Sequence, residues 1–122
     1  MSRKKILIVE DEYVGALGLA DMLDLWGYEV CDIASTGEDA IASADGKKPD
    51  VILMDVNLNG QIDGIHAAKQ IICRSFVPVI FMSGYEAERI RELMDQMELG
   101  GQFHILGKPI DLDCLETILA SI

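Results

Sequence analysis

The sequence has few basic residues and no long apolar run, and both absences narrow the possible functions. Ten lysines and arginines stand against 21 aspartates and glutamates, so the formal net charge is −11 at pH 7. Because no basic patch offsets this charge, we expect no binding to nucleic acid or to a membrane surface. No apolar run approaches the roughly twenty residues that cross a bilayer, so we expect neither a membrane anchor nor a signal peptide.

Cysteine is also scarce. Cys31, Cys73 and Cys114 are odd in number and lack the spacing of a metal site or a redox pair. Each has apolar neighbours in the sequence, which predicts reduced, structural cysteines in a cytoplasmic protein. His66 and His104 have no companions at ligand spacing, so we expect both to be solvated or locally hydrogen-bonded.

Short apolar runs alternate with amphipathic stretches along the whole chain. The expected strands are Lys5–Val9, Glu29–Ile33, Asp50–Met54, Val77–Met82 and Gln102–Leu106. Strands that are apolar on both faces and joined by helices predict an α/β fold, a doubly wound five-stranded parallel sheet with five helices. No linker, repeat or low-complexity segment divides the 122 residues, so we expect one domain over residues 1–122 and no output domain.

The helices are predicted from apolar periodicity and from their first residues. Glu12 is interpreted as the start of the first helix, Ser35 with Glu38 as a capping box for a helix to about Ala44, and Asp63 as the cap of a helix to about Cys73. The helical stripes are Leu19, Met22, Leu23 and Trp26; Ile90, Leu93, Met94 and Met97; and Leu112, Leu115, Leu119 and Ile122.

Polar residues stand where the expected strands end. Glu10 and Asp11 follow the first strand, Asp55 the third, Ser83 the fourth and Lys108 the fifth. Ligands bind at the carboxyl ends of strands in open α/β sheets, so we expect these side chains to meet. Carboxylates this close have raised pKa values unless a cation is bound, and oxygen ligands alone favour Mg²⁺, with Asp11 and Asp55 as the first candidates.

This set of residues predicts phosphoryl transfer. With Lys108 and Ser83 donating to the phosphate oxygens, Asp55 could attack phosphorus as a carboxylate nucleophile and form an aspartyl phosphate. The ordered landmarks Glu10-Asp11, Asp55, Asp63-Gly64, Ser83 and Lys108-Pro109 resemble the response-regulator receiver domain of two-component systems over essentially the whole chain.

The resemblance implies the receiver fold with strand order 2-1-3-4-5 and a role for each landmark. Asp55 would be the phosphoacceptor, and Mg²⁺ would be bound by Asp55, by Asp11 directly, by Glu10 through water and by the main-chain carbonyl of Asn57. Ser83 and Lys108 would bind the phosphoryl oxygens, with a cis bond between Lys108 and Pro109.

The resemblance further implies a single-domain response regulator that is cytoplasmic, a monomer or a weak phosphorylation-dependent dimer. Its partners would be a histidine kinase or histidine phosphotransfer protein and a downstream protein target. The segment Pro78 to Tyr85 is similar to the signature of the FAT GUY receivers, and the loop Asn57–Asp63 is one residue longer than the commonest receiver version.

The residues expected to change conformation on phosphorylation, which form the switch of a receiver, differ from the usual pattern. Receivers typically carry Tyr or Phe three residues before the lysine, and here that position is Ile105. Phe103 has the same facing by strand alternation. Together with Ser83, Tyr85 is our candidate for a substitute switch.

Two alternatives to the phosphoacceptor come from other classes. A degenerate receiver would act as an interaction module independent of phosphorylation, although it would usually lack one of the landmark residues. A flavodoxin-like enzyme would bind FMN through a loop rich in Ser, Thr and Gly, where this chain has Glu10-Asp11-Glu12, or would be a phosphatase that needs a substrate-binding cap.

Overall fold

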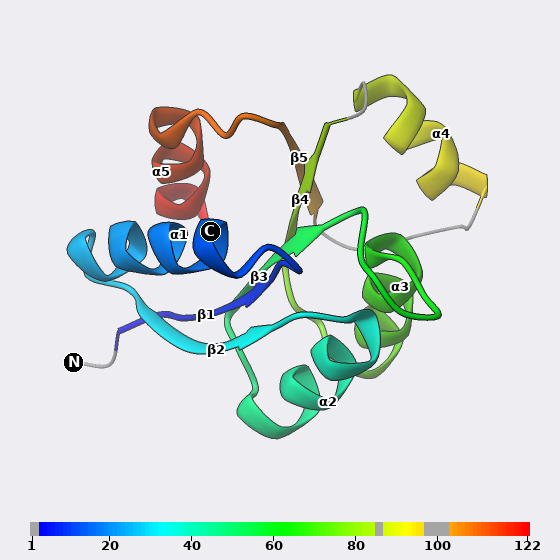
Figure 1. Cartoon of the computed structure of the whole chain (residues 1–122), viewed down its shortest axis with the longest axis horizontal. Coiled ribbons are helices and arrows are strands. Elements are labelled where there is room, and N and C mark those ends of the chain that lie inside the picture. The colour runs from blue at the N-terminus through cyan, green and yellow to red at the C-terminus, as the bar shows by residue number, and fades with distance from the viewer. Residues whose placement is uncertain (1–2, 85–86, 97–102) are drawn as a thin grey trace.

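Five parallel strands form one sheet in the order β2-β1-β3-β4-β5, and helices connect them (Figure 1). The computed structural model describes residues 3–84, 87–96 and 103–122. The strands are β1 (Lys5–Val9), β2 (Glu29–Ala34), β3 (Val51–Asp55), β4 (Val79–Ser83) and β5 (Phe103–Gly107). The helices are α1 (Tyr13–Leu25), α2 (Gly37–Lys47), α3 (Gly64–Arg74), α4 (Ala87–Gln96) and α5 (Leu112–Ser121). This topology confirms the predicted fold class.

Helices cover both faces of the sheet, as the apolar strands predicted. Ile6 and Ile8 of β1 pack in the cluster that α1 and α5 cover, whereas Leu7 and Val9 pack in the cluster that includes residues of α2, α3 and α4. All four side chains are fully buried, since successive residues of a strand point to opposite faces. None of the helices in the described ranges has the length and apolar character needed to span a membrane.

The predicted start of α2 is wrong by one residue. Thr36, not Ser35, is the N-cap, and its hydroxyl accepts the N–H of Asp39 at 3.1 Å. Glu38 does not complete a capping box at this terminus. Its carboxylate instead accepts two backbone N–H groups, those of residues 61–62, at 3.2 Å each. Glu38 therefore contacts a distant loop, whereas the cap of α2 is a local hydrogen bond of Thr36.

Other element ends differ less from the prediction. Asp63 caps α3 as expected, since its carboxylate accepts the N–H of His66 at 2.8 Å. Glu12 occupies the N-cap position of α1, but its side chain makes no capping hydrogen bond. The α2 helix continues past its expected end to Lys47, and Trp26 follows the last residue of α1. Met97 and Gln102 lie outside the described residues.

The cysteines are free, as predicted, but two of them are not buried structural residues, and one histidine differs from the expectation at one ring nitrogen. All three cysteines are free, but Cys73 and Cys114 are exposed and only Cys31 is partly buried. Apolar sequence neighbours did not predict burial because the neighbours of a helical residue point to other faces. The Nδ1 atom of His66 lies 2.8 Å from Asp63 Oδ1, as expected, whereas the Nε2 atom of His104 is buried without a partner among the described residues.

Candidate functional site

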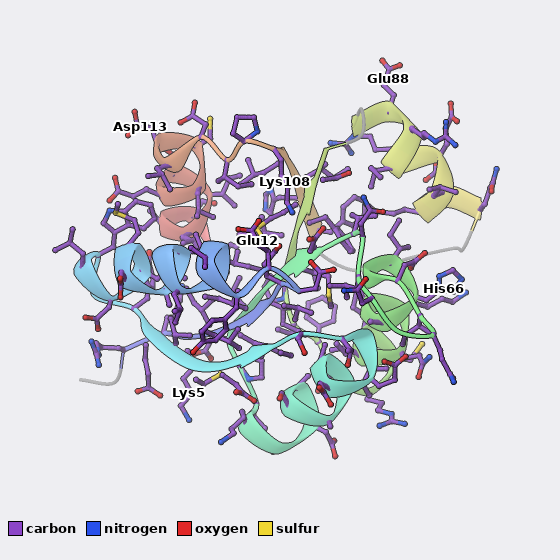
Figure 2. The ribbon with its side chains drawn as sticks, in the orientation of Figure 1. Lys5, Glu12, His66, Glu88, Lys108 and Asp113 are labelled. Atoms are coloured by element: carbon purple, nitrogen blue, oxygen red, sulfur yellow. The ribbon has the colours of Figure 1, made fainter. Side chains whose placement is uncertain are left out.

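The polar residues at the strand ends meet at one edge of the sheet. Glu10 follows β1, Asp55 ends β3 and Ser83 ends β4, and all three are buried. Lys108 comes from the connection between β5 and α5, and Figure 2 shows it near this edge together with Glu12 at the start of α1. Parallel strands bring their carboxyl ends together, which is why residues so distant in sequence become neighbours.

Three carboxylates form the centre of the site. Glu10, Asp11 and Asp55 each offer an oxygen, and these oxygens lie within 4.8 Å of one another. Within the described part of the chain, no other group of three potential metal ligands comes this close. Asp55 is only 3% exposed, whereas Asp11 is the most accessible of the three. An oxygen-only set of this kind fits Mg²⁺, which prefers carboxylates and water.

Lys108 is the cation that faces this cluster. Its Nζ atom donates to Asp55 Oδ2 at 2.9 Å and to Glu10 Oε2 at 3.3 Å. Its backbone N–H donates to the carbonyl of Ser83 at 2.8 Å, and the Lys108–Pro109 bond is cis, as predicted. Burial disfavours the ammonium, but hydrogen bonds and charges from Asp55 and Glu10 outweigh it and raise the pKa of Lys108. Lys108 is therefore a permanent positive charge at the site.

Glu10 holds a proton more tightly than an ordinary glutamate. Burial, followed by the hydrogen bond and the negative charge of Asp55, raises the pKa of Glu10 to about 7, although Lys108 acts in the opposite direction. The sequence predicted this effect for crowded carboxylates without a bound cation. A divalent cation would replace the proton and allow all three carboxylates to be charged.

The raised pKa predicts that the metal-free protein loses stability as the pH rises. The folded chain keeps a proton on Glu10 that the unfolded chain releases, so the free energy of unfolding falls between about pH 5 and pH 8. We expect a loss on the order of 2 kcal/mol, measured by urea unfolding in EDTA at several pH values. Glu10→Gln should flatten the curve relative to wild type. Identical slopes for the two proteins would contradict this origin.

The loop after β3 begins beside Asp55. The N–H of Asn57 donates to Asp55 Oδ1 at 3.0 Å, which orients the carboxylate. The loop ends at Gly64, whose N–H donates to the carbonyl of Val56 at 2.9 Å and so joins the two ends of the loop. The metal-binding role of the Asn57 carbonyl stays a prediction.

The switch candidates are only partly described. Tyr85 lies outside the described residues. Ile105 is partly buried opposite Phe81 in the sheet, and it packs on the same core cluster as Phe103, as strand alternation predicted. The rings of Phe81 and Phe103 meet edge to face with their centroids 6.3 Å apart. The position that is usually aromatic in receivers is therefore aliphatic and packed in this chain.

Two features beside the site were not predicted. A cavity of about 460 Å³ lies between α1 and the β5–α5 connection, lined among others by Glu10, Gly18, Met82 and Lys108. The second feature is the contact of Glu38 with the loop after β3. The sequence held no signal for this contact, because a glutamate in the first turn of a helix is an ordinary capping residue.

The comparisons with known proteins agree with this geometry. The family model of the response regulator receiver domain matches residues 6–120. The transcriptional regulatory protein PdtaR of Mycobacterium tuberculosis is 32% identical over 112 residues, which cover 92% of this chain and 53% of PdtaR. A protein-glutamate methylesterase/protein-glutamine glutaminase of Archaeoglobus fulgidus is 33% identical over 96 residues, or 79% of this chain and 27% of that protein. The chain thus spans about half or less of these relatives.

Solved structures show the same fold. The signal receiver domain of a modulated diguanylate cyclase from Desulfovibrio desulfuricans superposes with a TM-score of 0.85 at 28% identity, covering 98% of this chain and 93% of that one. The receiver domain of PhyR from Erythrobacter litoralis has a TM-score of 0.82 at 26% identity, covering 99% and 90%. From the matched family model, the strand order and the acidic site, we conclude that this chain belongs to the response regulator receiver domain family.

Proposed function

We propose that this receiver accepts a phosphoryl group on Asp55 from a histidine kinase or histidine phosphotransfer protein in a reaction that requires Mg²⁺. The observation that carries the proposal is the placement of Lys108 Nζ 2.9 Å from Asp55 Oδ2, beside the carboxylates of Glu10 and Asp11. A buried carboxylate that faces both a cation and further metal ligands is suited to attack phosphorus. The signal then passes by conformational change to a downstream protein.

Each residue has a separate task in this mechanism. Asp11 and Asp55 would hold the metal directly, Glu10 through water, and Asn57 through its main-chain carbonyl. Bound Mg²⁺ would neutralise charge on the incoming phosphate. Asp55 would supply the electron pair that forms the new O–P bond, and the leaving group departs in line from phosphorus. Lys108 and the Ser83 hydroxyl would donate to the phosphoryl oxygens.

The conformational response would begin at Ser83. An aspartyl phosphate adds nearly two negative charges, attracts the hydroxyl of Ser83 and biases the following loop and α4 between two arrangements. Because Ile105 cannot act as an aromatic switch, we keep Tyr85 as the candidate partner of Ser83. Membership of the FAT GUY subfamily stays a prediction, since the comparisons identify receivers in general.

We further propose that the chain works as a single-domain response regulator, a monomer or a weak phosphorylation-dependent dimer, without binding nucleic acid or membranes. The net charge of −11 supports protein and cation partners over phosphate backbones. The cytoplasm remains the predicted compartment. A degenerate receiver that only binds partners is the second candidate, but the presence of Glu10, Asp11, Asp55, Ser83 and Lys108 favours the phosphoacceptor.

The proposal is tested by intact mass after incubation with acetyl phosphate, with and without Mg²⁺. We expect wild type to gain one phosphoryl group only when Mg²⁺ is present. No gain under either condition, and no beryllofluoride binding by NMR, would favour the degenerate interaction module. A flavin absorbance band in the purified protein, or release of phosphate from many small phosphoesters, would favour the flavodoxin-like alternatives.

Asp11→Asn is expected to weaken Mg²⁺ binding by about tenfold or more, because an amide removes one charge from the ligand set. Calorimetric titration with MgCl₂ measures this change. Asp21→Asn, on the exposed side of α1, is the matched control and should bind as wild type does. Equal affinity in the Asp11 variant would remove this residue from the metal site.

A further inference from the structure

The loop of residues 57–63 is tied to α2 at its tip. Asn59 forms an isolated parallel bridge with Thr36, just before α2. Next to this bridge, Glu38 Oε1 accepts the N–H groups of Gln61 and Ile62, at 3.2 Å each. The loop would otherwise leave these exposed backbone donors to water. One side chain of α2 therefore holds two consecutive peptide groups of a loop that begins at the phosphoacceptor.

Two glycines allow this close approach. Gly60 has a φ of +108°, and a Cβ atom there would lie 2.9 Å from Glu38 Oε2. A Cβ atom on Gly37 would lie 2.6 Å from Cγ1 of Ile62. Larger residues at either position would push the loop and α2 apart. A glycine in the loop and a glycine in α2 therefore both favour this contact.

The carboxylate of Glu38 acts as an anion in this contact. Backbone N–H groups, its own first and then those of Gln61 and Ile62, lower the pKa of Glu38 although it lies at the surface. Hydrogen bonds to a charged acceptor are stronger than those between neutral groups. The loop tip is therefore held by charge-assisted bonds at neutral pH.

The base of the same loop lies in the site. The N–H of Asn57 donates to Asp55 Oδ1, and Gly64 closes the loop on the carbonyl of Val56. The loop is thus attached at both ends, with its base closed and its tip bound to α2, and Asn57 lies between these attachments. Groups that orient metal ligands from outside typically change metal affinity by about 10- to 100-fold when removed.

We propose that Glu38 is a positioning residue for the metal site: by holding the tip of the loop, it presets the backbone carbonyl of Asn57 for Mg²⁺. This inference rests on the proposed function, which places that carbonyl among the metal ligands. Glu38 would act through the loop and would itself contact neither the metal nor the phosphoryl group.

The test compares Glu38→Ala, Glu38→Gln and Asp39→Ala by calorimetric titration with MgCl₂. Glu38→Ala should raise the Kd for Mg²⁺ about tenfold, whereas Glu38→Gln, which keeps an acceptor at Oε1, should stay within about twofold of wild type. Asp39→Ala removes an acid from the same first turn of α2 without removing the loop contact, so it should bind as wild type does. Amide hydrogen exchange should become faster at residues 61 and 62 only in Glu38→Ala.

Gly60→Ala perturbs the same contact from the loop and keeps the test decisive if Glu38→Ala does not fold. It too should weaken Mg²⁺ binding, and it should also lower the melting temperature of the metal-free protein, because a φ of +108° is unfavourable for alanine. A Kd unchanged in Glu38→Ala and Gly60→Ala, with wild type binding Mg²⁺ and gaining a phosphoryl group, would overturn this inference and leave the proposed function standing. A wild type that binds no Mg²⁺ would overturn both.

Discussion

Asp55→Asn is expected to abolish the gain of a phosphoryl group from acetyl phosphate, as measured by intact mass in the presence of Mg²⁺. The amide has no free electron pair of comparable nucleophilicity to attack phosphorus, and it removes one charge from the metal site. It keeps the volume of the buried side chain and an oxygen that can accept the N–H of Asn57. The loss should therefore exceed about a hundredfold in rate without a change in fold.

The free energy of unfolding of Asp55→Asn shows whether phosphorylation is lost because the nucleophile is missing or because the protein is unfolded. A neutral residue at position 55 removes the charge that helps to raise the pKa of Glu10, but it also removes one of the two carboxylates that Lys108 bonds, so the metal-free variant should stay folded with a free energy of unfolding within about 2 kcal/mol of wild type. Asp50→Asn is the matched control, since Asp50 lies just before β3, at its other end, and its carboxylate accepts the N–H of Lys5. Phosphorylation of Asp55→Asn at the wild-type rate would show that another residue is the acceptor.

Gly64→Ala is expected to destabilise the fold by about 3 kcal/mol, the upper range for overpacking. A Cβ atom at this position would lie 2.0 Å from the carbonyl oxygen of Asp55 and 2.9 Å from its carbonyl carbon. Both contacts are with backbone, so no side chain can rotate away, and α3 must move from the end of β3. Urea unfolding measures the loss, and a phosphorylation assay should show a parallel defect because the backbone of Asp55 moves.

The control for this variant is another helical glycine. A Cβ atom on Gly18 of α1 would meet no atom within 4 Å, so Gly18→Ala should stabilise the protein by up to about 1 kcal/mol through helix propensity. If Gly64→Ala proved as stable as Gly18→Ala, the close approach between α3 and β3 would not exist in solution.

The sequence predicted the sheet well because a strand that is buried on both faces is a continuous run of apolar residues. Residues 6–9 and 51–54 are continuously apolar and are each followed by an acidic residue, and a parallel sheet needs such strands. The same topology places the ends of β1 and β3 at one edge, so the meeting of Glu10 and Asp55 followed from strand order alone. The cap Asp63 was also correct, since its hydrogen bond is made within one turn.

The larger errors arose where a residue meets a distant segment. Glu38 binds the loop before α3, a contact between segments more than twenty residues apart. The choice of Ser35 over Thr36 as the cap of α2 was a local error of one residue, since serine and threonine are both good caps. Cys73 and Cys114 have apolar neighbours in sequence but face solvent, because the direction of a helical side chain depends on which face the fold covers.

The sequence by itself thus determined the order of strands and helices along the chain and the edge where Lys108 stands beside the acidic residues, because residue type and local period encode these. Tertiary structure alone decided that Lys108 bonds both Glu10 and Asp55, and that Glu38 holds the loop beside the site. Hydrogen bonds and pKa values depend on distances and on exclusion of water between segments far apart in the chain. The pattern of neighbouring residues in the sequence does not predict those distances.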